Sequence, residues 1–152
     1  MERPEHEAWM RIALTQASLA SDGDDVPVGA VVVSAQGRVL GAGFNRREVD
    51  HDPTAHAEIV ALRAAGRSAQ AWRLTGATLV VTLEPCAMCA GAAVAARVGR
   101  IVFGAYDDKA GACGSVWDLP RDRGSLHRPE VYAGVLAEVC AERLRGFFDA
   151  RR

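Results

Sequence analysis

Residues 77–105, with the sequence ATLVVTLEPCAMCAGAAVAARVGRIVFGA, decide the fold. Ala77–Leu83 is a short, almost wholly apolar run, which is typical of a strand covered on both faces. The small residues of Cys86–Val98 predict a helix, and Arg100–Ala105 predicts a further strand. A strand, a helix and a strand in succession indicate a sheet with helices packed against it.

The segment before this unit continues the alternation of helices and strands. Apolar positions at helical spacing predict a helix over Glu5–Ala20. Val28–Val33 and Val39–Phe44 predict two strands of an antiparallel hairpin, joined by the turn AQGR. The glycines of the second strand, Gly41 and Gly43, indicate a bulge or the close approach of another backbone.

A further helix is predicted from about Ala55 to Ala65. Asp52 is a candidate N-cap for it, Pro53 suits its first turn, and Gly66 is expected to stop it.

The C-terminal third begins with a long loop over residues 106–129, which we expect to be functional and to hold a short helix near Trp117. Residues 130–134 predict a last edge strand, and the amphipathic stretch 135–152 predicts a C-terminal helix. The whole pattern predicts a three-layer α/β/α domain over residues 1–152, with helices on both faces of a mixed five-stranded sheet.

Composition restricts the class of protein. A chain of 152 residues suits one globular domain, and 49% hydrophobic with 24% charged residues excludes a disordered or fibrous protein. The start, MERPEHEAWMRIAL, has mixed charge and does not resemble a secretory signal. No charge-free run approaches the roughly 18 apolar residues that cross a bilayer. We therefore expect a soluble, cytoplasmic protein without a membrane partner.

The charges are balanced overall but uneven along the chain. The 18 basic and 19 acidic residues give a net charge of −1, which does not by itself indicate a nucleic-acid-binding protein. Residues 1–60 hold 5 basic and 10 acidic residues, and the remainder holds 13 and 9. The second portion can thus present a local basic surface to an RNA partner.

Two predicted helix starts carry residues suited to metal binding and proton transfer. DPTAHAEIVALR places His56 and Glu58 two residues apart, and LEPCAMCAG places Cys86 and Cys89 three apart, directly after Pro85. The three-residue spacing turns both sulfurs to one side of a helix, whose N-terminal dipole favours thiolates. If the two helix starts meet at one edge of the sheet, one histidine and two cysteines converge.

One histidine and two cysteines suit a catalytic zinc ion. Three protein ligands leave the fourth tetrahedral position of Zn²⁺ open to water, whereas structural zinc is normally closed by four. The metal lowers the pKa of that water to as little as about 7, and Glu58 beside it can carry protons.

Each half of this pattern, taken alone, is compatible with a role outside catalysis. A single histidine at a helix start can be a cap, and a CxxC pair can be redox-active or part of a four-ligand structural site. Together the two halves favour a catalytic metal site. Cys113 and Cys140 are distant and lack paired spacing, so we expect both to be packed thiols.

Histidine-x-glutamate followed by proline-cysteine-x-x-cysteine is the signature of zinc-dependent nucleobase deaminases. Further stretches resemble the bacterial tRNA-specific adenosine deaminases over nearly the whole chain and imply the cytidine deaminase-like fold. These stretches are HEAWMRIAL, VPVGAVVV, GFNRR, HDPTAHAEIVALR, RLTGATLVVTLEPCAMCAGA, GRIVFGAYDDKAGACGS and GVLAEVCAERLRGFF.

The resemblance implies an enzyme that hydrolyses adenosine to inosine at the wobble position of the arginine tRNA with an ACG anticodon. One Zn²⁺ per subunit would be held by His56, Cys86 and Cys89, and Glu58 would move protons from water to N1 and to the departing ammonia. The resemblance also implies a homodimer that binds the anticodon stem-loop. The residues it assigns to substrate binding are Asn45, Ala57, Val28, Asp107, Lys109 and Phe148.

The chain departs from the family at three positions in the C-terminal half. Tyr106 stands where a basic residue is common, Asp108 adds a second acid beside Asp107, and Pro129 follows the pair HR.

Two other functions are compatible with parts of the pattern. A deaminase of a free base such as guanine or cytosine would share the zinc site without needing an RNA-facing loop. In a non-catalytic zinc-binding or RNA-binding module, Glu58 would only cap a helix.

Overall fold

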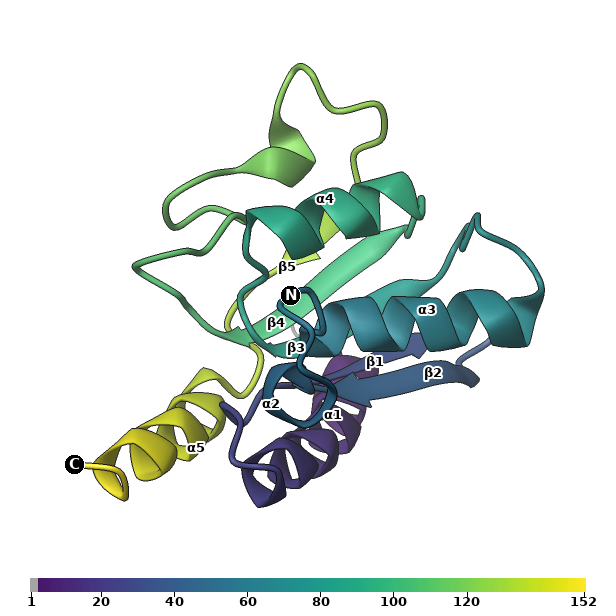
Figure 1. Ribbon diagram of the computed structural model, residues 1–152. Coiled ribbons are helices and arrows are strands. Elements are labelled where there is room, and N and C mark those ends of the chain that lie inside the picture. Colours follow the sequence, from purple (N-terminus) through teal and green to yellow (C-terminus); the bar gives the residue numbers. More distant parts are fainter. Residues whose placement is uncertain (1–2) are drawn as a thin grey trace.

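A computed structural model of the protein describes residues 3–152 as a central sheet between two layers of helices (Figure 1). The elements before the middle of the chain are α1 (Pro4–Asp22), β1 (Gly29–Val33), β2 (Val39–Phe44), α2 (Arg47–Asp50) and α3 (Ala57–Ala69). The elements after it are β3 (Thr78–Leu83), α4 (Ala87–Ala95), β4 (Arg100–Ala105), the 3₁₀ turn η1 (Leu119–Arg121), β5 (Glu130–Tyr132) and α5 (Ala137–Asp149).

The sheet has five strands in the order β2-β1-β3-β4-β5 and is mixed, as predicted. β1 pairs antiparallel with β2 and with β3, whereas β3, β4 and β5 run parallel. The predicted hairpin is therefore the antiparallel portion, and the strand-helix-strand unit of residues 77–105 is the parallel portion. β5 confirms the predicted edge strand over three of its five residues.

The two faces of the sheet are covered by different helices, and the side chains of each strand alternate between them. In β3, Leu79 and Val81 join the core under α3 and α4, whereas Val80 joins the core under α1 and α5. α1 and α5 thus lie on one face, and α3 and α4 lie on the other (Figure 1). This arrangement confirms the predicted helices on both faces.

The two glycines of β2 let α3 lie directly on the strand. A Cβ atom at Gly41 would lie 2.5 Å from the Ala65 nitrogen, and one at Gly43 would lie 2.7 Å from the Ala57 oxygen. Backbone is the obstacle at both positions, so any side chain would push the helix outward. The close approach predicted from these glycines is confirmed, and it determines where the start of α3 lies.

The predicted boundaries of α3 are wrong at both ends. Asp52 does not cap the helix, because its Oδ1 accepts hydrogen bonds from the N–H (2.9 Å) and the hydroxyl (2.8 Å) of Thr54. Because this turn includes Pro53 and Thr54, the helix begins only at Ala57, and His56 is its N-cap residue. Gly66 lies inside the helix, which ends instead at Gln70 in a left-handed conformation.

Other boundaries differ by two or three residues. α4 ends at Ala95 rather than at the predicted Val98. The helix cannot continue through Arg97, because this residue has a positive φ of 63°. η1 confirms the short helix expected near Trp117. None of the helices within residues 3–152 is long and apolar enough to cross a bilayer.

Candidate active site

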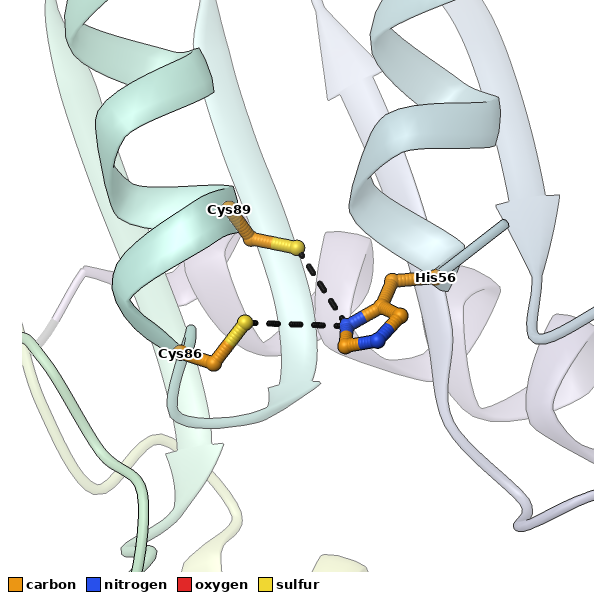
Figure 2. Close-up of side chains that lie close together, drawn as sticks. All are labelled: His56, Cys86 and Cys89. Carbon is orange, nitrogen blue, oxygen red and sulfur yellow. Dashed lines mark hydrogen bonds between the residues drawn. The ribbon is translucent and has the colours of Figure 1, made fainter. Parts of the chain in front are cut away.

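The starts of α3 and α4 meet beside the end of β3 and bring together three potential metal ligands (Figure 2). His56 is the N-cap residue of α3, Cys86 is the N-cap residue of α4, and Cys89 lies in the first turn of α4. The Nδ1 atom of His56 lies 3.6 Å from the sulfur of Cys86 and 3.6 Å from that of Cys89. The expectation that the two helix starts converge is confirmed.

These separations fit one tetrahedral zinc ion. Zinc bonds of about 2.05 Å to nitrogen and about 2.3 Å to sulfur, at the tetrahedral angle, place the two donors about 3.6 Å apart. The three donor atoms lie within 4.8 Å of one another, and no fourth histidine, cysteine or carboxylate of residues 3–152 joins them. Cys113 and Cys140 are packed thiols, 3% and 1% exposed. The side chains can therefore coordinate one metal ion and leave a position open, which is the pattern of a catalytic site.

The local electrostatics prepare Cys86 to ligate a cation. Its hydrogen bond with Cys89 lowers the pKa of the Cys86 thiol to about 4, and the His56 ring also lowers it, against the opposing effect of burial. The same hydrogen bond, together with burial, raises the pKa of Cys89, so Cys89 is the protonated member of the pair. The hydrogen bond with Cys86 raises the pKa of His56. A bound cation removes the remaining thiol proton, because a coordinating thiol is deprotonated outright.

Glu58 is a buried acid beside this cluster. It lies in the first turn of α3 and is only 4% exposed. The pKa of its carboxyl is raised to about 7, mainly by burial and also by the nearby Cys86 thiolate, against the opposing effects of a backbone hydrogen bond, the charge of His56 and a hydrogen bond with Cys89. Glu58, His56 and Cys86 line one pocket of about 190 Å³. The pocket therefore places a proton-carrying group next to the metal ligands.

The predicted base-binding residues lie around this pocket. Val28 and Asn45 line it, whereas Ala57 does not. The N–H of Ala57 donates to Asn45 Oδ1 at 2.9 Å, and Asn45 Nδ2 donates to the carbonyl of Val26 at 3.1 Å. An asparagine side chain has two N–H donors and two acceptor lone pairs, so Asn45 keeps one of each beyond these two hydrogen bonds.

The three residues predicted to contact RNA fall in two places. Asp107 lines the pocket, and its Oδ1 accepts hydrogen bonds from the backbone N–H groups of Lys109 and Ala110. Lys109 and Phe148 instead line a neighbouring shallow groove of about 650 Å³, and Phe148 is 48% exposed there. The other residues of this groove are Leu144, Arg145, Asp149, Arg151 and Arg152. Four cations and one exposed aromatic ring thus lie beside the pocket.

Glu84 is a structural residue of the site that the motifs did not reveal. It is 2% exposed, and its carboxylate accepts hydrogen bonds from the N–H groups of Asp107 (3.1 Å), Cys113 (3.0 Å) and Ser115 (3.1 Å). The Ser115 hydroxyl donates a fourth, at 2.5 Å. The sequence offered one sign of this role, since Glu84 is a charged residue directly after the buried strand β3. Glu84 holds the loop that carries Asp107 against the pocket.

Asp25 is a second such residue, directly before Val26 of the pocket lining. It is 1% exposed and accepts hydrogen bonds from the guanidinium of Arg47 (2.9 Å) and the N–H groups of Glu48 (3.1 Å) and Val26 (2.9 Å). Burial raises the pKa of its carboxyl, but these three donors outweigh burial and the net pKa is lowered. Arg47 also lines the pocket, two residues after Asn45. Asp25 therefore fixes the segment that carries Asn45 and Arg47.

Comparisons with known proteins agree with this geometry. Residues 3–105 match the family model for the cytidine and deoxycytidylate deaminase zinc-binding region. The chain belongs to this deaminase family. The deaminase is 49% identical over 146 residues to the tRNA-specific adenosine deaminase of Haemophilus influenzae, with 96% of this chain and 84% of that protein covered.

Solved structures confirm the cytidine deaminase-like fold of the deaminase. One comes from a study of A-to-I editing by tRNA:A34 deaminases at the wobble position of transfer RNA. It matches with a TM-score of 0.87 at 43% identity and covers 90% of this chain and 99% of that chain. A guanine deaminase from Nitrosomonas europaea matches with a TM-score of 0.78 at 28% identity, with coverage of 97% and 85%. Among these relatives, the deaminase is most similar to the tRNA-specific adenosine deaminases, as the sequence motifs predicted.

Proposed function

We propose that the deaminase converts adenosine to inosine at the wobble position of the arginine tRNA with an ACG anticodon. One observation carries the catalytic part of this proposal. The buried carboxyl of Glu58 lines the same pocket as two of the three metal ligands, His56 and Cys86. A carboxyl that only capped a helix would face solvent at the helix start, and it would have no reason to be buried in a pocket.

The reaction consumes one water and releases one ammonia. Zinc held by His56, Cys86 and Cys89 would lower the pKa of water and make hydroxide available near neutral pH. Glu58 accepts one proton of the water and delivers it to N1 of the adenine ring while the oxygen bonds to C6. Glu58 then carries the second proton to the exocyclic amino group. The C6–N bond breaks, ammonia leaves, and the C6 carbonyl of inosine remains.

The residues around the pocket hold the base. Asn45 has one N–H donor and one acceptor lone pair free, which suit the polar edge or ribose of a nucleoside. Val28 offers an apolar wall to the ring. Ala57 acts through its hydrogen bond to Asn45, since this bond engages its N–H and orients the asparagine amide. An adenosine must leave the base stack of the anticodon loop to enter this pocket.

The groove beside the pocket supports an RNA substrate over a free base. Lys109 has no ion-pair partner among the described residues and supplies positive charge for a phosphate, and the exposed ring of Phe148 offers a stacking surface. Arg145, Arg151 and Arg152 also line the groove, each in a solvent-exposed pair with an acid that a phosphate can replace. Asp107 lines the pocket, and in the proposed complex it accepts a hydrogen bond from a ribose hydroxyl. A deaminase of free guanine or cytosine would have no use for this groove.

The proposed active form is a homodimer. An apolar groove of about 400 Å³ lies between α3 and α4, and its lining includes Ile59, Leu62, Trp72 and Leu74. Trp72, in the loop after α3, is 64% exposed. An exposed apolar surface of this kind marks an interaction site. Light scattering of the purified protein tests the oligomeric state, and a monomer at micromolar concentration contradicts the dimer.

The deciding experiment measures inosine at the wobble position of an in-vitro transcribed arginine tRNA with an ACG anticodon. Zinc-loaded wild type is compared with Glu58→Gln, which keeps the size of the side chain and removes its proton-carrying ability. We expect about one zinc per chain in both proteins and a loss of turnover of at least about 100-fold in the variant.

Two results would overturn parts of the proposal. No inosine from zinc-loaded wild type, with turnover of free guanine or cytosine that is insensitive to salt, would assign a base deaminase instead. Full activity of Glu58→Gln would exclude the carboxyl as the proton carrier.

A further inference from the structure

A small basic pocket lies between α1 and α5, outside the site described above. Its volume is about 240 Å³, and its lining residues are Ser18, Ser21, Pro27, Arg143, Phe147 and Arg151. The predicted substrate residues of the deaminase do not include any of these six. Two arginines in a pocket of this size suit an anion.

Arg143 is held so that part of its guanidinium stays free. Its NH1 donates to the carbonyl of Leu14 at 3.1 Å and to the hydroxyl of Ser18 at 3.0 Å. Within residues 3–152, no carboxylate pairs with Arg143 and no acceptor engages its Nε or NH2. The side chain is thus fixed at one nitrogen, and the other two retain donors for a ligand.

The second arginine has a different environment. Arg151 pairs with Asp24 and lies over the Phe147 ring, 3.4 Å from its centroid. The pair between Arg151 and Asp24 is exposed to solvent, so it offsets only part of the charge of Arg151 and leaves the guanidinium open to a competing anion. The charge of Arg143 has no such partner among the described residues. The pocket therefore keeps an excess of positive charge.

The position of this pocket connects it to the active site. Pro27 lines it, and the two neighbours of Pro27, Val26 and Val28, line the catalytic pocket. Arg151 is shared with the groove that contains Lys109. Figure 1 shows α5 running beside the end of α1 and the segment that leads into β1. The catalytic pocket and the basic pocket thus adjoin the same 26–28 segment, and the basic pocket meets the groove at Arg151.

From this arrangement we infer that Arg143 and Arg151 form a subsite for a backbone phosphate of the RNA strand whose adenosine enters the catalytic pocket. The inference rests on the proposed tRNA function and adds a contact to it. A guanidinium with two free donor nitrogens binds phosphate oxygens in a forked geometry. Pro27 and Phe147 supply an apolar wall, so the phosphate meets the arginines away from bulk water on one side.

Arg143 also ties α5 to α1, so a test must separate charge from packing. Arg143→Gln removes the charge and keeps an N–H donor for the carbonyl of Leu14. The control is Arg38→Gln, because Arg38 is an exposed arginine in the turn after β1, at the other end of that strand. Both variants are compared with wild type by thermal unfolding and by tRNA affinity at several salt concentrations between about 50 and 300 mM.

We expect Arg143→Gln to bind tRNA about 3- to 10-fold more weakly at about 100 mM salt. The slope of log affinity against log salt concentration falls by about 0.7 to 0.9, as for the loss of one phosphate contact. The melting temperature stays within about 2 °C of wild type, and the turnover rate at saturating tRNA is unchanged. Arg38→Gln changes neither the affinity nor the slope.

Equal slopes for Arg143→Gln and Arg38→Gln would overturn the subsite, even if wild type forms inosine. A reduced slope for Arg143→Gln without inosine from wild type would keep the subsite and reject the proposed reaction. A last measurement repeats thermal unfolding in the presence of inorganic phosphate. If phosphate raises the melting temperature of wild type but not of Arg143→Gln, and tRNA affinity is the same for both, the pocket takes free phosphate and the RNA assignment is wrong.

Discussion

Replacing Glu84 by glutamine should loosen the loop that carries Asp107 without touching a metal ligand. Glutamine matches the shape of glutamate but has only one acceptor oxygen. If the amide nitrogen of the glutamine takes the position of Oε1, the Ser115 hydroxyl can rotate and accept a hydrogen bond from it. The N–H of Asp107, now 3.1 Å from the Oε1 acceptor, would instead face another donor. The hydrogen bonds of Cys113 and Ser115 to the second oxygen lose the benefit of the negative charge.

The magnitude follows from these changes. A buried N–H without an acceptor costs about 1–3 kcal/mol, and hydrogen bonds to a charged group are roughly twice as strong as neutral ones. The free energy of unfolding should therefore fall by about 2–4 kcal/mol. For a protein of this size, 1 kcal/mol lowers the melting temperature by about 2–4 °C. We expect a decrease of about 4–16 °C for Glu84→Gln.

Thermal unfolding of the zinc-loaded protein is the assay, with Glu142→Gln on the exposed surface of α5 as the control. The zinc content should stay at one per chain, and amide hydrogen exchange should accelerate over residues 107–115. A melting temperature within about 2 °C of both wild type and the control would refute the view that Glu84 organises this loop.

Three further predictions test other parts of the structure. Asp25→Asn should lower stability near neutral pH. Because the pKa of Asp25 is lowered in the folded protein, its contribution is complete above the ordinary aspartate pKa of about 3.9 and is lost as the pH falls below it. The melting temperatures of variant and wild type should then converge toward pH 3, and a constant difference down to that pH would contradict the linkage. Gly43→Ala should destabilise by about 1–3 kcal/mol, because the new methyl group meets the backbone of α3, whereas Gly146→Ala, where no atom lies within 4 Å, should stabilise by about 0.5–1 kcal/mol. Denaturant unfolding of both variants checks this contrast, and equal effects would show that close packing of α3 on β2 is not what requires the glycine. Cys89→Ser should reduce bound zinc well below one per chain by metal analysis after dialysis, and full retention would show that two side chains are enough to hold the ion.

Much of the fold followed from the sequence because burial selects apolar residues. The strands of residues 28–44 and 77–105 were predicted nearly to their ends, since a strand that is covered on both faces is apolar over its whole length. The predicted start of α3 was wrong because Asp52 has two possible roles. Its carboxylate can cap a helix or close a turn with Thr54, and local sequence does not decide between them.

The metal ligands were also accessible from the sequence. His56, Cys86 and Cys89 belong to two short motifs at predicted helix starts, and the alternation of strands and helices brings such starts to one edge of a sheet. Their side chains carry a chemistry that few other residue types share. The pairing of the motifs therefore predicted both the site and its metal before any distance was known.

Tertiary structure alone decided which residues support the site. Glu84 and Asp25 look like ordinary acids in the sequence, and only the folded chain shows each one buried with backbone N–H groups as partners. Arg143 is one of many arginines until α5 packs on α1 and fixes its guanidinium beside Ser18. The physical reason is that ligand identity is a local property of a motif. Burial, hydrogen-bond partners and shared pockets are relations between segments far apart in the chain, and they exist only once the chain has folded.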